Sequence, residues 1–325
     1  MTGIRKIEEE LTGVGSIAIS GHMRPDGDCL GSCMGLYLYL KENFPQLECV
    51  DVYLQEYPDT FDIISGTDRI RHSYDHETVY DLFIALDCGD AQRLAEFEEC
   101  FHNARRTVCY DHHISNTGFA DVNYIDPNIS STSELIFHVM DEEKISKRTA
   151  EALYMGISHD TGIFQYSCTS PETMITAAAL MRKGINCSYI NDFTYMEKTF
   201  VQNQILGRAL LESRLILDGR CIYSMVNRRD MEFYGVAPKD LDGIVSQMRL
   251  TKGVEVAFFL YETEENVFKA SIRSKTYADV SKVAGHFGGG GHVRAAGCTM
   301  YGEASDVAEE LIRQIGIQLQ QDKIQ

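Results

Sequence analysis

The sequence is short of positive charge. Its 325 residues include 30 lysines and arginines against 48 aspartates and glutamates, which gives a formal net charge of −18. This balance argues against a protein that holds long duplex nucleic acid on a broad basic surface. A small or short anionic substrate remains compatible with it, provided that basic residues are concentrated locally.

Other features that the sequence lacks narrow the class of protein further. The ten cysteines form no CxxC pair and no spacing typical of a zinc knuckle or a disulfide framework, and most lie among apolar residues, which favours a reducing cytosol. The stretch "MTGIRKIEEELTGVGS" has acidic residues where a signal peptide needs an apolar core. No run approaches the roughly 20 apolar residues of a membrane span. We therefore expect a cytoplasmic protein with no membrane partner.

The first half of the chain alternates β-rich runs with helical stretches. This alternation predicts an α/β domain with a parallel sheet and helices on both faces, and the continuously apolar run "LFIAL" is typical of its strands. A small-residue helix face, "GSCMG" (31–35), is expected to pack tightly against that sheet. Around 181–200 the pattern is lost, and strand pairs with helices follow. We predict a first domain at 1–185, a linker at 186–203 and a smaller mixed α/β domain at 204–325.

Polar side chains able to bind metal follow three of the apolar strands. "IAISGH" ends in His22, "LFIALD" in Asp87, and "VCYDHH" in Asp111, His112 and His113. Because the carboxyl ends of parallel strands line one crevice, these side chains should converge in space. Asp111 is not expected to be a ligand: it orients His112 or His113, or simply ends the strand.

Further acids complete the candidate set. The stretch "GHMRPDGDCLGS" places Asp26 and Asp28 in a tight turn at a helix start, and Asp160 follows a helix in "HDTGIF", where His159 is interpreted as local support. Four carboxylates and two imidazoles without a thiolate suit Mn²⁺, and less specifically Co²⁺, Zn²⁺ or Mg²⁺. Six side chains are too many for one metal that keeps an open position. They suit two metals that lie about 3.5–4 Å apart and share one bridging carboxylate. The set is His22, Asp26, Asp28, Asp87, His112 and Asp160.

These motifs carry a family resemblance. "HMRPDGDCLGS", "ALDCGD", "YDHH" and "HDTGIF" resemble, in this order, the motifs of the DHH phosphoesterase superfamily. "FGGGGHVRAAG" is similar to the glycine-rich signature of the DHH-associated C-terminal domain. The chain most resembles the stand-alone oligoribonucleases of the nanoRNase, or bifunctional oligoribonuclease and PAP phosphatase, type.

The resemblance implies an activity and roles for individual residues. It implies hydrolysis of short oligoribonucleotides to mononucleotides, and removal of a phosphate from 3'-phosphoadenosine 5'-phosphate, with two Mn²⁺ or, as alternatives, Mg²⁺ or Co²⁺. By similarity, His22, Asp26 and Asp87 hold one metal, and the second is held by Asp28, Asp87, His112 and Asp160. His113 then faces the substrate phosphate, so that the expected catalytic residues are Asp87, Asp111 and His113.

The second half offers a candidate binding site for the substrate. Four consecutive glycines precede His292, and we expect an ordered loop whose backbone N–H groups approach an anion closely. Residues 266–294 hold five lysines and arginines against one acid, in an otherwise acidic chain. Arg273, at a strand end, is the best candidate for a phosphate or base contact. The expected substrate-binding residues are Arg273, Gly288, Gly289, Gly290, Gly291 and His292.

Several alternatives stay open. Short single-stranded RNA, a mononucleotide or a dinucleotide is the expected partner, with a homodimer left as an option. A phosphodiesterase of cyclic di-AMP or pApA is the main enzymatic rival, followed by a RecJ-like single-strand exonuclease, which would normally be longer. An inorganic pyrophosphatase is disfavoured by the GGGGH stretch. An inactive nucleotide sensor should have lost metal ligands, and none is lost here.

Overall fold

A computed structural model describes residues 5–320 of the chain. The chain divides into two compact units, one up to Glu197 and the other from Lys198 on, and each is described by itself. The interval 186–203, expected as a linker, contains the helix α7 (Cys187–Asn191), a π-helical turn (Asp192–Met196) and the start of α8 (Phe200–Leu211).

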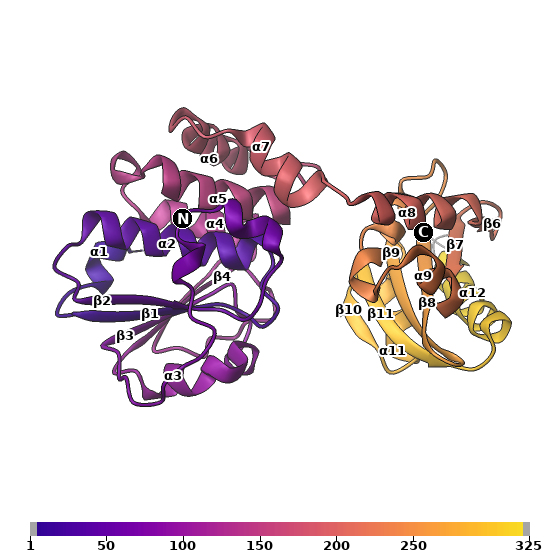
Figure 1. Cartoon of the computed structure of the whole chain (residues 1–325), viewed down its shortest axis with the longest axis horizontal. Coiled ribbons are helices and arrows are strands. Elements are labelled where there is room, and N and C mark those ends of the chain that lie inside the picture. The colour runs from indigo at the N-terminus through magenta and orange to yellow at the C-terminus, as the bar shows by residue number, and fades with distance from the viewer. Residues whose placement is uncertain (1–4, 321–325) are drawn as a thin grey trace. The chain divides into compact units, whose positions relative to one another are not determined.

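The first unit is built on a five-stranded parallel sheet with the order β2-β1-β3-β4-β5 (Figure 1). The prediction of a parallel sheet in an α/β domain is confirmed. The strands are β1 (Ser16–Ser20), β2 (Cys49–Tyr53), β3 (Leu82–Leu86), β4 (Thr107–Asp111) and β5 (Val122–Ile125).

Helices cover both faces of this sheet, as expected. Alternate residues of β3 belong to two different apolar cores: Leu82 and Ile84 pack with the helices above the sheet in Figure 1, and Phe83 packs with those below it. This explains why "LFIAL" is apolar throughout. The helices are α1 (Ile7–Glu10), α2 (Gly27–Asn43), α4 (Thr132–Val139), α5 (Lys147–Asp160) and α6 (Pro171–Arg182) above, and α3 (Glu98–Asn103) below.

The two glycines of "GSCMG", Gly31 and Gly35, contact another helix rather than the sheet, so the partner predicted for them was wrong. A Cβ on Gly31 would lie 2.6 Å from the carbonyl oxygen of Ala152 in α5, and a Cβ on Gly35 would lie 2.5 Å from the side chain of Leu153. Without side chains at these positions, α2 and α5 approach closely. This contact places the start of α2 beside the end of α5.

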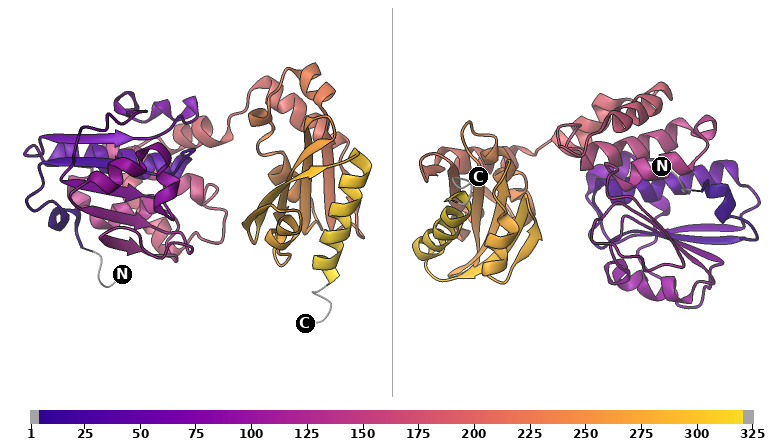
Figure 2. Two further views of the ribbon diagram at one scale, coloured as in Figure 1. Left: turned by 90° about the horizontal axis from the view of Figure 1, so that it is seen from below. Right: turned by 180° about the vertical axis from the view of Figure 1, so that it is seen from behind.

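The second unit contains a mixed six-stranded sheet with the order β10-β11-β9-β8-β7-β6, in which only β7 and β8 are parallel neighbours. The expected smaller mixed α/β domain is confirmed. Figure 2 shows α12 lying along this sheet. The strands are β6 (Arg214–Ile216), β7 (Cys221–Val226), β8 (Val256–Glu264), β9 (Val267–Ser274), β10 (Gly290–His292) and β11 (Ala295–Tyr301).

Two apolar cores flank the second sheet. Residues of α8 and α10 (Ile244–Arg249) pack in one core with alternate residues of β7 and β8, and α9 (Arg228–Tyr234) lies beside it. Residues of α11 (Val280–His286) and α12 (Ala304–Gln320) pack in the other. Within residues 5–320, no helix is both long enough and apolar enough to cross a membrane.

Candidate metal centre

The three polar strand ends of the first unit meet at one edge of the sheet. The strands β1, β3 and β4 are consecutive neighbours in the sheet, and their carboxyl ends lead directly to His22, Asp87 and His112. Two of these side chains are fully buried or nearly so, with His22 6% and Asp87 2% exposed. The convergence expected from a parallel sheet is therefore present in the structure.

The start of α2 adds two carboxylates. Asp26 caps this helix, and its side chain accepts hydrogen bonds from the backbone N–H groups of Asp28 and Cys29, both at 3.1 Å. Asp28 lies in the first turn and is fully buried. The side chains of these two residues therefore belong to a helix start with fixed geometry rather than to a mobile loop.

The N-terminus of α4 holds the buried carboxylates in place, which the sequence analysis missed. The backbone N–H groups of Thr132 and Ser133 donate to Asp28 Oδ2 at 2.7 Å and Oδ1 at 2.8 Å. The Thr132 hydroxyl also donates to Asp87 Oδ1 at 3.1 Å. Only the Ser/Thr-rich start of this helix was visible in the sequence. Its contact with residues about a hundred positions earlier required the fold.

Asp87 lies between two histidines. Its Oδ2 is 3.4 Å from His22 Nε2, and its Oδ1 is 3.4 Å from His112 Nε2. Its backbone has φ = 55°, in the left-handed region, which strains every residue except glycine and is tolerated best by asparagine and aspartate. Such strain, of order 1–3 kcal/mol, is retained where the surroundings enforce it and clusters at functional sites.

Around Asp87 the other predicted ligands form two groups. On one side, Asp26 Oδ2 is 3.6 Å from His22 Nε2. On the other side, His112 Nε2 lies 4.0 Å from Asp28 Oδ2 and 3.1 Å from Asp160 Oδ2. Asp160 is the last residue of α5, and it reaches the centre because α5 packs closely on α2. All six side chains named from the sequence are thus brought together in these two groups.

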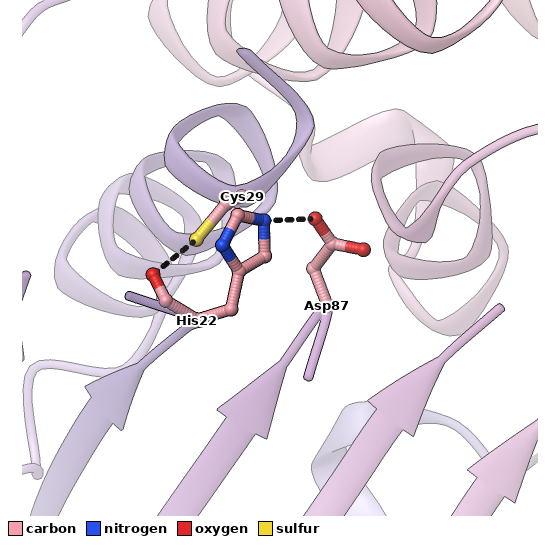
Figure 3. A group of neighbouring side chains, drawn as sticks. All are labelled: His22, Cys29 and Asp87. Carbon is pink, nitrogen blue, oxygen red and sulfur yellow. Dashed lines mark hydrogen bonds and ion pairs between the residues drawn. The ribbon is translucent and has the colours of Figure 1, made fainter. Parts of the chain in front are cut away.

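Cys29 is an unexpected neighbour of the first group. It is one of the cysteines that lie among apolar residues in the sequence, and its side chain is fully buried. Its sulfur nevertheless lies within reach of His22 and Asp87 and donates to the His22 carbonyl oxygen at 3.8 Å (Figure 3). Burial raises the pKa of this thiol well above its usual range, so it adds no negative charge. Its place one residue after Asp28 was the only hint in the sequence.

The side chains of His113 and Asp111 form a pair of their own. His113 Nδ1 lies 2.7 Å from Asp111 Oδ1, and the Asn116 side-chain amide donates to the other oxygen, Oδ2, at 2.7 Å. The bond to Asp111 raises the pKa of His113. Of the two alternatives for Asp111, this geometry favours orientation of His113. Because Nδ1 is engaged by the carboxylate, Nε2 is the ring nitrogen available to a ligand.

The electrostatics of the centre favour cations. Burial opposes charge on both histidines, yet hydrogen bonds to Asp26 and Asp87 raise the pKa of His22, and hydrogen bonds to Asp160 and Asp87 raise the pKa of His112 to about 12. Burial raises the pKa of Asp28 well above its usual range and that of Asp160 to about 6. For Asp87, the two histidines outweigh burial and lower its pKa. Protons thus partly neutralise a crowded set of carboxylates.

No lysine or arginine of residues 5–197 forms an ion pair with the carboxylates of Asp26, Asp28, Asp87 and Asp160, whose ion-pair partners in this range are all histidines. Asp28 and Asp87 are buried. Buried carboxylates without a permanent counter-charge are costly, and divalent cations would supply that charge. The oxygen and nitrogen atoms present also fit the ligand preferences of such cations. The residues of the site are therefore compatible with divalent metal.

The predicted substrate-binding residues lie together in the second unit. Arg273 on β9 pairs with Ala295 on β11, which in turn pairs with His292 on β10. Gly290 and Gly291 belong to β10, so the expected loop is partly a strand. A Cβ on Gly289 would lie 2.2 Å from the carbonyl oxygen of Gly297, and Gly288 has φ = 73°, which explains both glycines.

Comparisons with known proteins identify the class to which this fold and site belong. Residues 16–157 match the model of the DHH family, N-terminal domain, and residues 218–317 match that of the DHHA1 domain. The chain therefore belongs to the DHH family of phosphoesterases, with a DHHA1 domain in its second half. Members of this family are generally metal-dependent hydrolases.

Individual relatives are distant but cover nearly the whole chain. A probable bifunctional oligoribonuclease and PAP phosphatase, NrnA, of Streptococcus mutans is 27% identical over 96% of this chain and 98% of its own length. The bifunctional oligoribonuclease and PAP phosphatase NrnA of Thermus thermophilus is 28% identical over 95% of this chain and 92% of its own. The crystal structure of an exopolyphosphatase-related protein from Bacteroides fragilis superposes with a TM-score of 0.87 at 27% identity, covering 95% of this chain and 94% of that one.

Proposed function

We propose that the protein hydrolyses phosphoester bonds of short oligoribonucleotides to release mononucleotides, and that it also removes a phosphate from 3'-phosphoadenosine 5'-phosphate. Two divalent cations, most suitably Mn²⁺, would serve both reactions. The NrnA relatives whose names carry these two activities support this choice of substrates. Their identities of 24–28% support the family more strongly than the individual substrate.

The observation that carries the proposal is the position of Asp87 between the two groups. Each of its carboxylate oxygens faces a different histidine, and each histidine faces further acids. A carboxylate that turns one oxygen to each side is the arrangement needed to bridge two cations. In this proposal His22, Asp26 and Asp87 hold one cation, and Asp28, Asp87, His112 and Asp160 hold the other.

The roles of the remaining residues follow from their contacts. When bound, the two cations lower the pKa of water and neutralise the charge that develops on the departing oxygen. His113, held by Asp111, would direct its free Nε2 toward a phosphate oxygen and stabilise its charge. No side-chain nucleophile is required, and the Cys29 thiol beside the centre is fully buried, with its pKa raised by that burial.

In the second unit, we assign phosphate or base binding to Arg273, the glycine stretch 288–291 and His292. The exposed backbone of Gly290 and Gly291 permits close approach of an anion, and a guanidinium group binds phosphate through paired hydrogen bonds. The predicted boundaries, 1–185 for the catalytic part and 204–325 for the substrate-binding part, belong to this proposal.

The experiment is a side-by-side assay of the full chain with Mn²⁺. The substrates are 3'-phosphoadenosine 5'-phosphate, dinucleotide and pentanucleotide RNA, single-stranded DNA, pApA and cyclic di-AMP. We expect the highest kcat/KM for short RNA, with measurable release of phosphate from the first substrate. A clear preference for cyclic di-AMP, or processive degradation of long single-stranded DNA, would overturn the proposal in favour of one of the rivals.

A further inference from the structure

His159 contacts the backbone between two of the proposed metal ligands. It precedes Asp160 at the end of α5, and its ring reaches Gly27, the residue between Asp26 and Asp28. A Cβ on Gly27 would lie 2.2 Å from Cγ and 2.4 Å from Nδ1 of this ring. The imidazole therefore occupies the space that a side chain at position 27 would need.

The far end of the ring is tied to another segment. His159 Nε2 lies 2.9 Å from Thr194 Oγ1, and that hydroxyl donates to the Ile190 carbonyl oxygen at 2.7 Å. Since the single hydroxyl proton is used in this second bond, Nε2 must carry hydrogen and donate. Nδ1, on the side of Gly27, is then unprotonated. Burial lowers the pKa of His159 to about 4, in agreement with a neutral ring.

The position of the ring is fixed from several sides. Phe61 and Tyr195 contact it edge to face, each with ring centroids 5.2 Å away. A second hydrogen bond joins the segment that contains Thr194 to α5, because Ser158, the neighbour of His159, donates through Oγ to Asn191 Oδ1 at 2.6 Å. The ring cannot shift along α5 without breaking these contacts.

We propose that His159 is a positioning residue, which sets the distance between Asp160 at the end of α5 and the Asp26–Asp28 turn at the start of α2. The inference rests on the metal centre of the proposed function. Metal ligands must be held within about 0.5 Å of their working geometry, and groups outside the ligand set provide that precision. Without the imidazole, the turn at Gly27 has no support on this side, and its two carboxylates lose their fixed relation to Asp160.

The test measures Mn²⁺ binding by the full chain without substrate, by calorimetry and by electron paramagnetic resonance of free Mn²⁺. We expect His159→Ala to weaken binding of at least one of the two cations by about 10- to 100-fold. His159→Gln, whose amide can donate to Thr194, should recover part of this loss. Thr194→Val keeps the ring but removes its acceptor, and should give an intermediate loss.

His72→Ala is the control for loss of an imidazole away from the metal centre; this residue is exposed. His72 is also hydrogen-bonded through a ring nitrogen, to the Leu54 carbonyl oxygen at 2.9 Å, and lies beside Tyr57, but it contacts none of the proposed ligands. This variant should bind Mn²⁺ as the wild type does. Wild-type affinity for both cations in folded His159→Ala, or an equal loss in His72→Ala, would overturn the inference. If His159→Ala fails to fold, an unchanged affinity in Thr194→Val overturns it instead.

The Mn²⁺-binding test of His159 and the substrate assay of the proposed function can fail independently of each other. A wild-type protein that binds two Mn²⁺ but hydrolyses none of the nucleotides would remove the proposed function, while the binding losses in the variants would still support the role of His159. Wild-type hydrolysis together with unaffected Mn²⁺ binding in the variants would leave the proposed function intact and remove the role of His159.

Discussion

Replacement of Asp87 by asparagine is the sharpest test of a centre with two cations. Asparagine is among the residues that best tolerate a positive φ, so the backbone at φ = 55° should persist. Its carbonyl oxygen can still accept the hydrogen bond from Thr132. The substitution therefore removes one oxygen ligand and one negative charge while preserving the shape of the site.

The size of the effect follows from the position of Asp87. One of its oxygens faces His22 and the other faces His112, both at 3.4 Å, so an asparagine can serve only one of the two groups as an oxygen ligand. A correctly placed cation stabilises the transition state of phosphoryl transfer by several kcal/mol. A loss of about 4 kcal/mol corresponds to a decrease of about 1,000-fold in kcat.

The assay combines turnover of an RNA dinucleotide at saturating Mn²⁺ with thermal unfolding and Mn²⁺ stoichiometry. Asp87→Asn should be folded, bind fewer cations and show at least this loss in turnover. Asp90→Asn is the control, because Asp90 caps the next helical segment and asparagine is an equally good cap. Near-normal Mn²⁺-dependent turnover by Asp87→Asn would refute the bridging role.

Three further predictions concern other parts of the chain. Gly156→Ala places a Cβ 2.8 Å from Asp28 Oδ1 and should weaken Mn²⁺ binding in a calorimetric titration. The control, Gly207→Ala, has no atom within 4 Å of the new Cβ and should bind Mn²⁺ as the wild type does. Equal affinities of the two variants would contradict the prediction. Arg273→Ala should raise KM for dinucleotides far more than KM for an aryl phosphate ester, and equal effects would remove Arg273 from the substrate site. Burial alone would raise the pKa of Glu255, but hydrogen bonds from Thr276 and its neighbours outweigh burial and lower the pKa. The charged carboxylate therefore stabilises the fold at pH values above its unfolded pKa of about 4.3. This stabilisation is lost as the pH falls through the lower pKa of the folded state. Glu255→Gln should therefore lower the Tm at pH 7 and flatten its acid dependence, and an unchanged pH profile would disprove the role of these bonds.

The residues of the candidate site that follow the ends of strands could be predicted from the sequence. Local sequence shows that apolar strands end before His22, Asp87 and His112, and the geometry of a parallel sheet brings such ends together. Asp26 and Asp28 were visible for a similar reason, because a tight turn before a helix is recognisable from proline and glycine. The α/β class and the mixed second domain followed from the same alternation of patterns.

Contacts between distant helices were not predictable in this way. The bonds from Thr132 and Ser133 to Asp28, and the contact between His159 and Gly27, depend on how closely α2, α4 and α5 pack. The glycines of α2 were noticed, but their partner was assigned to the sheet, because a small residue does not reveal what approaches it. The metal and substrate roles of individual residues remain predictions.

The origin of the six proposed ligands links metal supply to the lifetime of the protein. They come from the ends of three strands, the start of α2 and the end of α5, so the complete set exists only when these five elements have packed together. Cations that bind this set and not the unfolded chain would stabilise the unit by about 2.7 kcal/mol at a free concentration 100 times Kd. A cell starved of that metal would then lose the protein to proteolysis as well as its activity, so that metal availability would regulate abundance.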